Sequence, residues 1–195
     1  EYLELQARPE QLEQQDQLVQ RVRQVQQVHS TGVMSKYKVC VYAIAKNEEK
    51  FVERFMNSVK EADAVYVLDT GSEDDTALKL KQLGAIVKTE IIKPWRFDVA
   101  RNKALEMVPE DTDICVSIDL DEVFEAGWRE KLEKAWKLNT NRATYNYNWS
   151  FDDYGNPAVN FYLNQIHSRK HYKWTHPVHE VLSCDIPENN VMIPE

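Results

Sequence analysis

The spacing of hydrophobic positions along the chain separates buried strands from the helices between them. Continuous apolar runs are typical of strands that are buried on both faces of a sheet, and they cover 39–45, 64–68, 85–88 and 113–118. Apolar residues that recur every three or four positions predict helices over 48–59, from about 75 to 83, and over 97–108. Asp74 or Asp75 is suited to cap the second helix, and Gly84 to end it.

Strands that alternate with helices predict an α/β fold with a Rossmann-like, mostly parallel sheet flanked by helices. After residue 140 the runs become short and rich in aromatics, and they predict a small antiparallel β extension from 143–150, 161–167, 171–174 and 178–182. Ligands of open α/β sheets bind at the carboxyl ends of the parallel strands. We therefore expect the residues that follow the buried strands to form the functional site.

Residues 1–33 differ from the rest of the chain. They are rich in Gln and Glu and carry one apolar stripe, which predicts a helical extension. Ser30-Thr31-Gly32 breaks this pattern, so the globular domain is expected to span 34–195. The extension is either a docking or coiled-coil helix, which would make a homo-oligomer, or a segment fused to the domain artificially.

Composition narrows the classes of function. A formal net charge of −8 argues against a general nucleic-acid binder, which needs a basic surface. The three cysteines, Cys40, Cys115 and Cys184, are far apart and form no CxxC pair, which argues against a zinc knuckle and fits a reducing compartment. The chain has no signal-peptide pattern and no apolar run near the roughly 18 residues that span a bilayer. These features predict a cytoplasmic protein and leave open a peripheral contact at the inner membrane face.

Two carboxylates, Asp119 and Asp121, close the fourth apolar run. Side chains alternate along an extended strand, so residues two positions apart lie on the same side. Two oxygen ligands on one side suit a hard divalent cation that also holds a diphosphate. The alternative is that the acidic residues only start a turn, which Asp favours.

Four motifs stand in order at the ends of these elements: Ala-Lys-Asn-Glu-Glu at 45–49, Asp-Thr-Gly-Ser-Glu-Asp-Asp-Thr at 69–76, Ala-Arg-Asn at 100–102 and Asp-Leu-Asp-Glu at 119–122. With them the chain resembles the family-2 inverting glycosyltransferases of GT-A fold, and most closely their bacterial AKNEE, DTGS, ARN and DxDE branch. The resemblance covers about residues 37 to 183. It implies transfer of a sugar from a nucleotide-sugar to a glycan, lipid-linked or peptide acceptor, and a UDP-sugar is the expected donor.

The resemblance also assigns donor-binding residues. Asp69 matches the residue that reads the uracil ring, and Ile44 and Lys46 flank the same pocket. Asp69 could instead only start the turn before Gly71, and Lys46 could be an ordinary exposed lysine.

Arg101 and Asn102 lie together on the helix before the fourth strand. The guanidinium of Arg101 suits a diphosphate because its planar N–H groups bind oxygens in pairs. An ion pair with Asp98 or a nearby Glu is the alternative for Arg101. Asn102 is expected to bond either the loop backbone or the donor sugar.

The resemblance gives Asp119 to the ribose or donor sugar and Asp121 to Mn²⁺ or Mg²⁺, which would neutralise charge on the departing UDP. Inversion also needs a general base. His179 is the candidate third metal ligand and Glu180 the candidate base, although adjacent strand residues point to opposite faces unless the segment is a loop. Asp153, with Asp152, is the second candidate for the base.

Two other functions compete with this interpretation. A GT-A domain that binds a nucleotide-sugar or a partner without turnover is the first. An aspartyl phosphatase is the second, but its DxD motif follows the first strand of the domain and here the motif follows the fourth. The aromatic stretch Trp149, Phe151, Tyr154, Tyr162 and Trp174 is expected to pack mainly in the core, with one or two rings free to line an acceptor groove.

Overall fold

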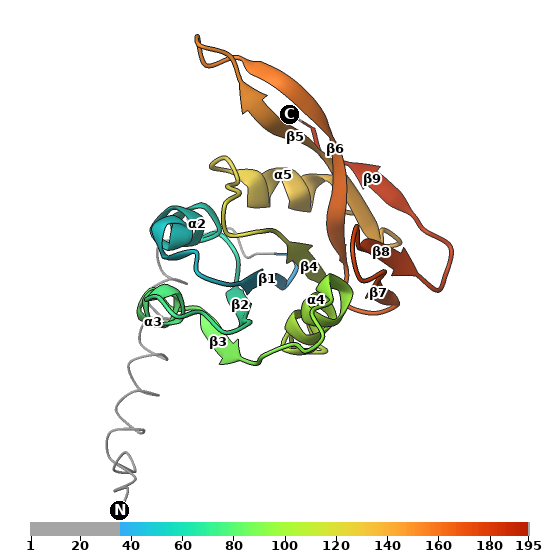
Figure 1. The fold of residues 1–195 in the computed structure, drawn as a ribbon. Helices are drawn as coiled ribbons and strands as arrows, with labels where there is room; N and C mark the ends of the chain where they lie inside the picture. The colour runs from blue at the N-terminus through green and yellow to red at the C-terminus, as the bar shows by residue number, and fades with distance from the viewer. Residues whose placement is uncertain (1–35, 195) are drawn as a thin grey trace, which may run out of the picture. The chain divides into compact units, whose positions relative to one another are not determined.

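A seven-stranded sheet organises the part of the chain that the computed structural model describes, residues 36–194 (Figure 1). Its strand order is β3-β2-β1-β4-β6-β5-β9. The first four of these strands are parallel, and they are β1 (Val39–Ala45), β2 (Ala64–Asp69), β3 (Ile86–Thr89) and β4 (Ile114–Ser117). The expected helical extension over 1–33 lies outside the described residues.

Helices cover both faces of the parallel strands, which confirms the predicted fold class. The 3₁₀ turn η1 (Glu49–Phe51) leads into α2 (Val52–Ser58), and the other helices are α3 (Thr76–Gln82), α4 (Phe97–Glu106) and α5 (Trp128–Ala135). Alternate residues of β1 enter different cores: Val41 packs in the core that includes α2, α3 and α5 residues, and Tyr42 in the core that includes α4 residues. None of the helices within 36–194 has the length and apolar character needed to cross a membrane.

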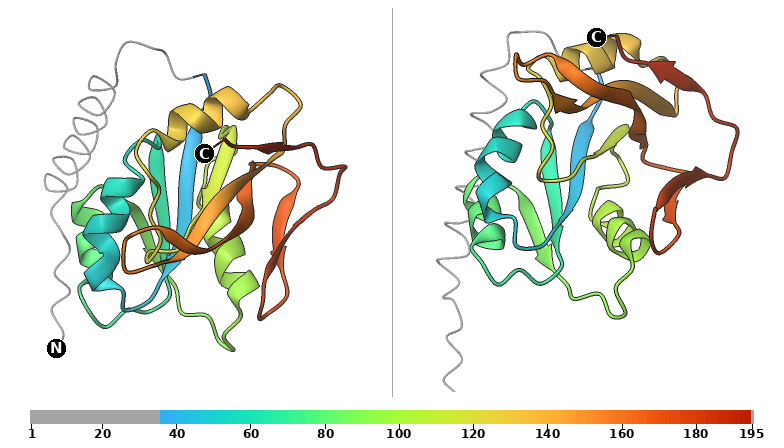
Figure 2. Two further views of the ribbon diagram at one scale, coloured as in Figure 1. Left: turned by 90° about the horizontal axis from the view of Figure 1, so that it is seen from above. Right: turned by 45° about the horizontal axis from the view of Figure 1, so that its top comes forward.

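The antiparallel extension is part of the main sheet. Strand β6 (Pro157–Ser168) pairs with β4 in antiparallel orientation, and β5 (Arg142–Phe151) pairs with β6. Strand β9 (Asn190–Met192) then joins β5 in parallel. The remaining two strands, β7 (Tyr172–Thr175) and β8 (Val181–Cys184), form a separate antiparallel pair. Figure 2 shows this pair beside α4, so it covers the same face of the sheet as that helix.

The structure departs from the sequence expectations at three short elements. The segment expected as one helix over 48–59 begins with η1, because the N–H groups of Glu48 and Glu49 bond the 74–76 loop. Helix α5 and strand β9 were not predicted. Helix α5 has only two buried apolar side chains, Trp128 and Leu132, and β9 has three residues, so neither produces a clear hydrophobic pattern.

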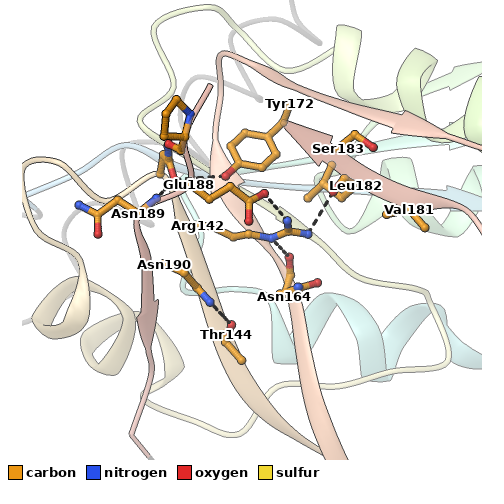
Figure 3. Close-up of polar contacts among 12 residues, drawn as sticks. Arg142, Thr144, Asn164, Tyr172, Val181, Leu182, Ser183, Glu188, Asn189 and Asn190 are labelled. Atoms are coloured by element: carbon orange, nitrogen blue, oxygen red, sulfur yellow. Dashed lines mark hydrogen bonds and ion pairs between the residues drawn. The ribbon is translucent and has the colours of Figure 1, made fainter. Parts of the chain in front are cut away.

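Arg142 ties the start of β5 to four other segments (Figure 3). Its buried guanidinium donates to the backbone oxygens of Asn164 at 3.0 Å and Leu182 at 3.2 Å, and it also pairs with the Glu188 carboxylate. The same guanidinium lies over the ring of Tyr172 at 5.7 Å. One side chain thus connects β5, β6, β7, β8 and the segment that leads to β9.

Candidate functional site

A cavity of about 260 Å³ lies at the carboxyl ends of the parallel strands. Its walls come from the loops after β1, β2 and β4 and from the start of α4. Five of its lining residues were predicted as site residues, namely Ile44, Lys46, Arg101, Asp119 and Asp121. The others are Ala45, Glu48, Thr70, Trp95 and Phe97. The expectation that the strand ends converge on one site is therefore borne out for these segments.

The DxDE segment is a turn and not the end of a strand. Strand β4 stops at Ser117, and the N–H of Glu122 donates to the carbonyl of Asp119 at 3.1 Å. Residues 120 and 121 form the turn, and Leu120 is fully buried between the two acidic residues. The Glu122 carboxylate accepts the N–H of Asp119 at 3.1 Å, which closes the turn. Asp119 and Asp121 nevertheless both line the cavity.

Arg101 is the central cation of the site. Its guanidinium is only 6% exposed and binds the Asp119 carboxylate through two bonds of 2.8 and 3.0 Å. Its Nε donates to Glu180 at 2.6 Å, and its guanidinium lies over the Trp174 ring at 5.0 Å. Arg101 therefore forms the ion pair that was its alternative role, with Asp119 and Glu180 as partners. Asp98, the other partner considered, pairs with Arg96 instead. Burial alone would lower the pKa of Arg101, and the two carboxylates raise it on balance.

Negative charge is concentrated beside this arginine. Burial, followed by repulsion from Asp119, raises the pKa of the Glu48 carboxyl to about 7. Burial likewise raises the pKa of the Glu122 carboxyl, and Asp119 and Asp121 add to the shift. Among the residues that line the cavity, Arg101 is the only buried cation that can balance these carboxylates. A bound cation would lower the electrostatic cost of holding them together.

Asn102 and Asp69 are both engaged by backbone groups. The Asn102 amide donates to the Trp174 carbonyl at 2.8 Å and accepts the Trp174 N–H at 2.8 Å, so it pairs with β7 like a neighbouring strand. This is the backbone role that the sequence left open for it. The buried Asp69 carboxylate accepts the N–H of Ser72 at 3.1 Å and holds the turn after β2. It is not among the cavity-lining residues.

The candidate bases and the third metal ligand lie in two different loops. His179 and Glu180 lie in the loop between β7 and β8, so the rule that adjacent strand residues point to opposite faces does not apply to them. His179 has a positive φ of 54°. Neither the exposed His179 nor Glu180 is among the cavity-lining residues, but Arg101 holds Glu180 beside Asp119. Asp153 is exposed in the β5–β6 turn. The neighbouring Asp152 carboxylate accepts the N–H groups of Tyr154 and Asn156, which stabilises that turn.

The donor set fits a divalent metal that is shared with a diphosphate. Within 36–194 no group of three or more His, Cys, Asp or Glu side chains is arranged to hold a metal ion by itself. Mg²⁺ commonly binds through one or two carboxylates and completes its shell with water and substrate phosphates. Asp121, exposed at the cavity beside Asp119 and Glu48, offers such a carboxylate.

Sequence reasoning missed three residues at the cavity. Glu48 belongs to the Ala-Lys-Asn-Glu-Glu motif but was not predicted as a site residue, because a half-buried loop residue leaves no periodic signal. Trp95 and Phe97 follow β3, and their rings pack edge to face with centroids 5.1 Å apart. The one sequence signal for them was the aromatic pair itself, which flanks Arg96 at the start of the helix that carries Arg101.

Comparison with known proteins agrees with the fold and the motifs. The family model of glycosyl transferase family 2 matches residues 40–182. A protein of Rickettsia bellii described as an uncharacterized glycosyltransferase is 35% identical over 97 residues, which are 49% of this chain and 32% of that protein. A protein of Rickettsia typhi with the same description is 37% identical over 97 residues, with the same two shares. The match thus spans about a third of the length of these relatives.

A solved structure shares the architecture. Glucosyl-3-phosphoglycerate synthase from Mycobacterium tuberculosis, in complex with Mn²⁺, UDP and glucosyl-3-phosphoglycerate, superposes with a TM-score of 0.50 at 19% identity. The superposition covers 69% of this chain and 58% of the synthase. At this identity the likeness concerns the fold, which is GT-A.

Proposed function

The chain belongs to glycosyl transferase family 2, and we propose that it transfers a sugar, with inversion, from a nucleotide-sugar to an acceptor in a metal-dependent reaction. A UDP-sugar is the proposed donor. The observation that carries the proposal is the cavity at the carboxyl edge of the sheet, where Lys46 and Arg101 face the carboxylates of Glu48, Asp119 and Asp121. Cations together with exposed carboxylates suit a diphosphate that arrives with a divalent metal.

Arg101 can serve both the fold and the donor. A guanidinium has five N–H groups, and the bonds to Asp119 and Glu180 use three of them. The two that are left lie on its terminal nitrogens, and Arg101 lines the cavity. We assign these two groups and the exposed Lys46 ammonium to the donor diphosphate, with Ile44 as an apolar wall.

The nucleoside and the sugar are assigned to the remaining predicted residues. Asp69 keeps its proposed role toward the uracil ring, since a carboxylate that accepts one backbone N–H still has lone pairs for another donor. Asp119 is proposed to accept hydroxyl groups of the ribose or of the donor sugar, and its side chain is 40% exposed. Asn102 is proposed to act indirectly, because its bond to β7 holds the Trp174 ring against the guanidinium of Arg101.

Asp121 is the proposed ligand of Mn²⁺ or Mg²⁺, and His179 is kept as a second candidate. The metal, when bound, would neutralise negative charge on the leaving diphosphate. Asp121 exposes its carboxylate at the cavity, where Glu48 supplies further negative charge. His179 would have to approach from the exposed β7–β8 loop.

Glu180 is the proposed general base, which accepts the proton of the acceptor hydroxyl. Arg101 holds its carboxylate beside Asp119, the residue proposed to bind the ribose or the donor sugar. Asp153 is the second candidate, but its position in the β5–β6 turn requires that the hairpin moves or that the acceptor reaches it. Glu180→Gln would separate the two, because it should abolish transfer while Asp153→Asn leaves it intact.

A nucleotide-sugar panel tests the proposal. Thermal shift with UDP-, GDP- and dTDP-sugars, with and without Mn²⁺, should show metal-dependent stabilisation by UDP-sugars, and nucleotide release should require the metal. Asp121→Asn should reduce nucleotide release by about 100-fold. The matched control is Asp75→Asn at the start of α3, which should behave as the wild type.

Three results would contradict parts of the proposal. If none of the nucleotide-sugars stabilises the protein, the donor assignment is wrong. If a nucleotide-sugar binds but is not turned over with any acceptor, the non-catalytic binding module is the better description. Equal activity with and without a chelator would exclude the metal.

A further inference from the structure

The outer part of the β5–β6 hairpin carries a cluster of exposed aromatic rings. The expectation that the aromatic stretch packs mainly in the core was wrong, because Trp174 alone of its five members is buried. Tyr147 lies opposite Phe161 across the two strands, with ring centroids 5.3 Å apart, and Trp149 lies 6.3 Å from Phe161. Trp149 is 67% exposed and Phe161 is 41% exposed. We call these three residues the aromatic face. Figure 1 shows the end of the hairpin standing clear of the other elements. Large exposed apolar clusters of this kind mark binding surfaces.

The aromatic face is continuous with the candidate active site. In the antiparallel register Val116 of β4 lies opposite Ile166, so residues 157–164 of β6 extend past the carboxyl end of β4. Tyr147 donates its hydroxyl hydrogen bond to Glu122, and Glu122 in turn binds the N–H of Asp119. The cluster therefore begins at the turn that carries Asp119 and Asp121 and runs outward from it.

The composition of the hairpin indicates what it binds. Its 22 residues from 143 to 164 contain seven aromatic residues and five asparagines. They contain only two charged residues, Asp152 and Asp153, whereas 29% of the whole chain is charged. Aromatic rings stack on the apolar faces of sugars, and amide groups bond hydroxyl groups, so this surface suits an uncharged polyhydroxylated ligand. A surface without Lys or Arg has no attraction for an anionic membrane.

We propose that the aromatic face binds the acceptor and that this acceptor is a neutral saccharide, whose rings stack on Trp149 and Phe161. The inference rests on the proposed function, because it assigns the hairpin to the acceptor of that same transfer. The saccharide would extend along the hairpin with its reacting hydroxyl at the DxDE turn, next to Glu180. The inference applies equally to a free glycan and to a glycan carried on a lipid, since the same sugar rings would stack on the aromatic face.

Binding of neutral tetrasaccharides of glucose, galactose, mannose and N-acetylglucosamine to the full chain tests the inference by saturation-transfer NMR. At least one should bind the wild type, and Trp149→Ala and Phe161→Ala should each weaken that binding by about 10-fold or more. Tyr162→Ala is the matched control. Tyr162 is exposed on the same strand, but it is adjacent to Phe161 and so points to the opposite face. Its affinity should stay within twofold, and all variants should melt as the wild type does.

The arms of the experiment separate the alternatives. Absence of binding by all four tetrasaccharides, or unchanged binding in Trp149→Ala and Phe161→Ala, would overturn the inference. Cosedimentation with phosphatidylcholine vesicles that Trp149→Ala abolishes would identify a lipid surface instead, and loss of self-association in light scattering would identify a second copy of the chain. Nucleotide release by the wild type without acceptor tests the proposed function separately, so either idea can fail while the other stands.

Discussion

A buried histidine should make this fold sensitive to mild acid. His167 on β6 is fully buried, and its Nδ1–H donates to the Ser168 carbonyl at 2.8 Å. Its Nε2 therefore accepts the hydroxyl of Tyr42 at 2.9 Å, and that hydroxyl accepts the indole N–H of Trp174 at 2.8 Å. Every polar atom of the chain Trp174–Tyr42–His167 is thus paired only while the imidazole is neutral. The network joins β1, β6 and β7, and Trp174 lies under Arg101.

The size of the effect follows from the two states of the histidine. Burial, together with the charges of Arg142 and Arg169, lowers the pKa of His167 from 6.5 to about 3. The unfolded chain therefore takes up the proton first as the pH falls, and the stability is present above pH 6.5 and lost below it. At pH 5 the folded histidine is still neutral, so the loss relative to pH 8 is about 2 kcal/mol, from RT ln(1 + 10^1.5). Any folded pKa below about 4 gives the same loss at pH 5.

Urea denaturation of the wild type and of His167→Gln at pH 8 and pH 5 isolates this contribution. The variant is expected to be less stable than the wild type at pH 8. Between pH 8 and pH 5, however, its free energy of unfolding should fall by about 2 kcal/mol less than that of the wild type. The difference between the two proteins is needed because the raised pKa of Glu48 acts in the opposite direction and destabilises the fold as the pH rises.

An exposed histidine provides the control. His176→Gln, in the β7–β8 loop, should leave the pH dependence within about 0.5 kcal/mol of the wild type. If His167→Gln and the wild type lose the same free energy of unfolding between pH 8 and pH 5, the imidazole is not the neutral, doubly bonded group described here.

Two further predictions concern residues that hold the site in place. Arg142→Met should lower the free energy of unfolding by about 3 kcal/mol, since two carbonyls and the Glu188 carboxylate lose their donor. In the same urea titration Lys38→Met, which removes an exposed ion pair, should lower it by less than about 1 kcal/mol. Equal losses in the two variants would refute the prediction. Asn102→Ala should accelerate amide hydrogen exchange in residues 172–182, because Trp174 loses both bonds to the side chain; unchanged exchange with weakened donor binding would return Asn102 to a direct contact with the sugar.

Elements with a strong hydrophobic period were predictable, and their boundaries agree closely. Strand β1 was predicted over the residues it occupies, because each of its two faces is buried in a core and the run is continuous. Strand β9 has no such signal, since its three residues gain their place by pairing with β5 far along the chain. Likewise, alternating aromatics predicted β strands over the hairpin, but not that β6 would join the parallel sheet at β4.

The site was predictable as a set of residue types at strand ends, but the partner of each side chain was not. Local patterns fix which residues leave a strand together, and the parallel topology then brings Lys46, Asp119 and Asp121 to one cavity. The sequence did not show where β4 ends, because Ile118 and Leu120 continue the apolar pattern past Ser117, where the structure leaves the strand.

Pairing across long separations decides the electrostatics, and the sequence offers no local signal for it. Arg101 is 18 residues from Asp119 and 79 from Glu180, and only the packing of β7 against α4 sets the Arg101–Glu180 distance. Since the buried guanidinium binds both carboxylates, removing it would leave Asp119 and Glu180 without their cation, and Asp119 already repels Glu48. Arg101 therefore cannot be classed as a donor ligand or as a structural ion pair alone, because the bonds that fix its position also fix the acidic residues around the donor.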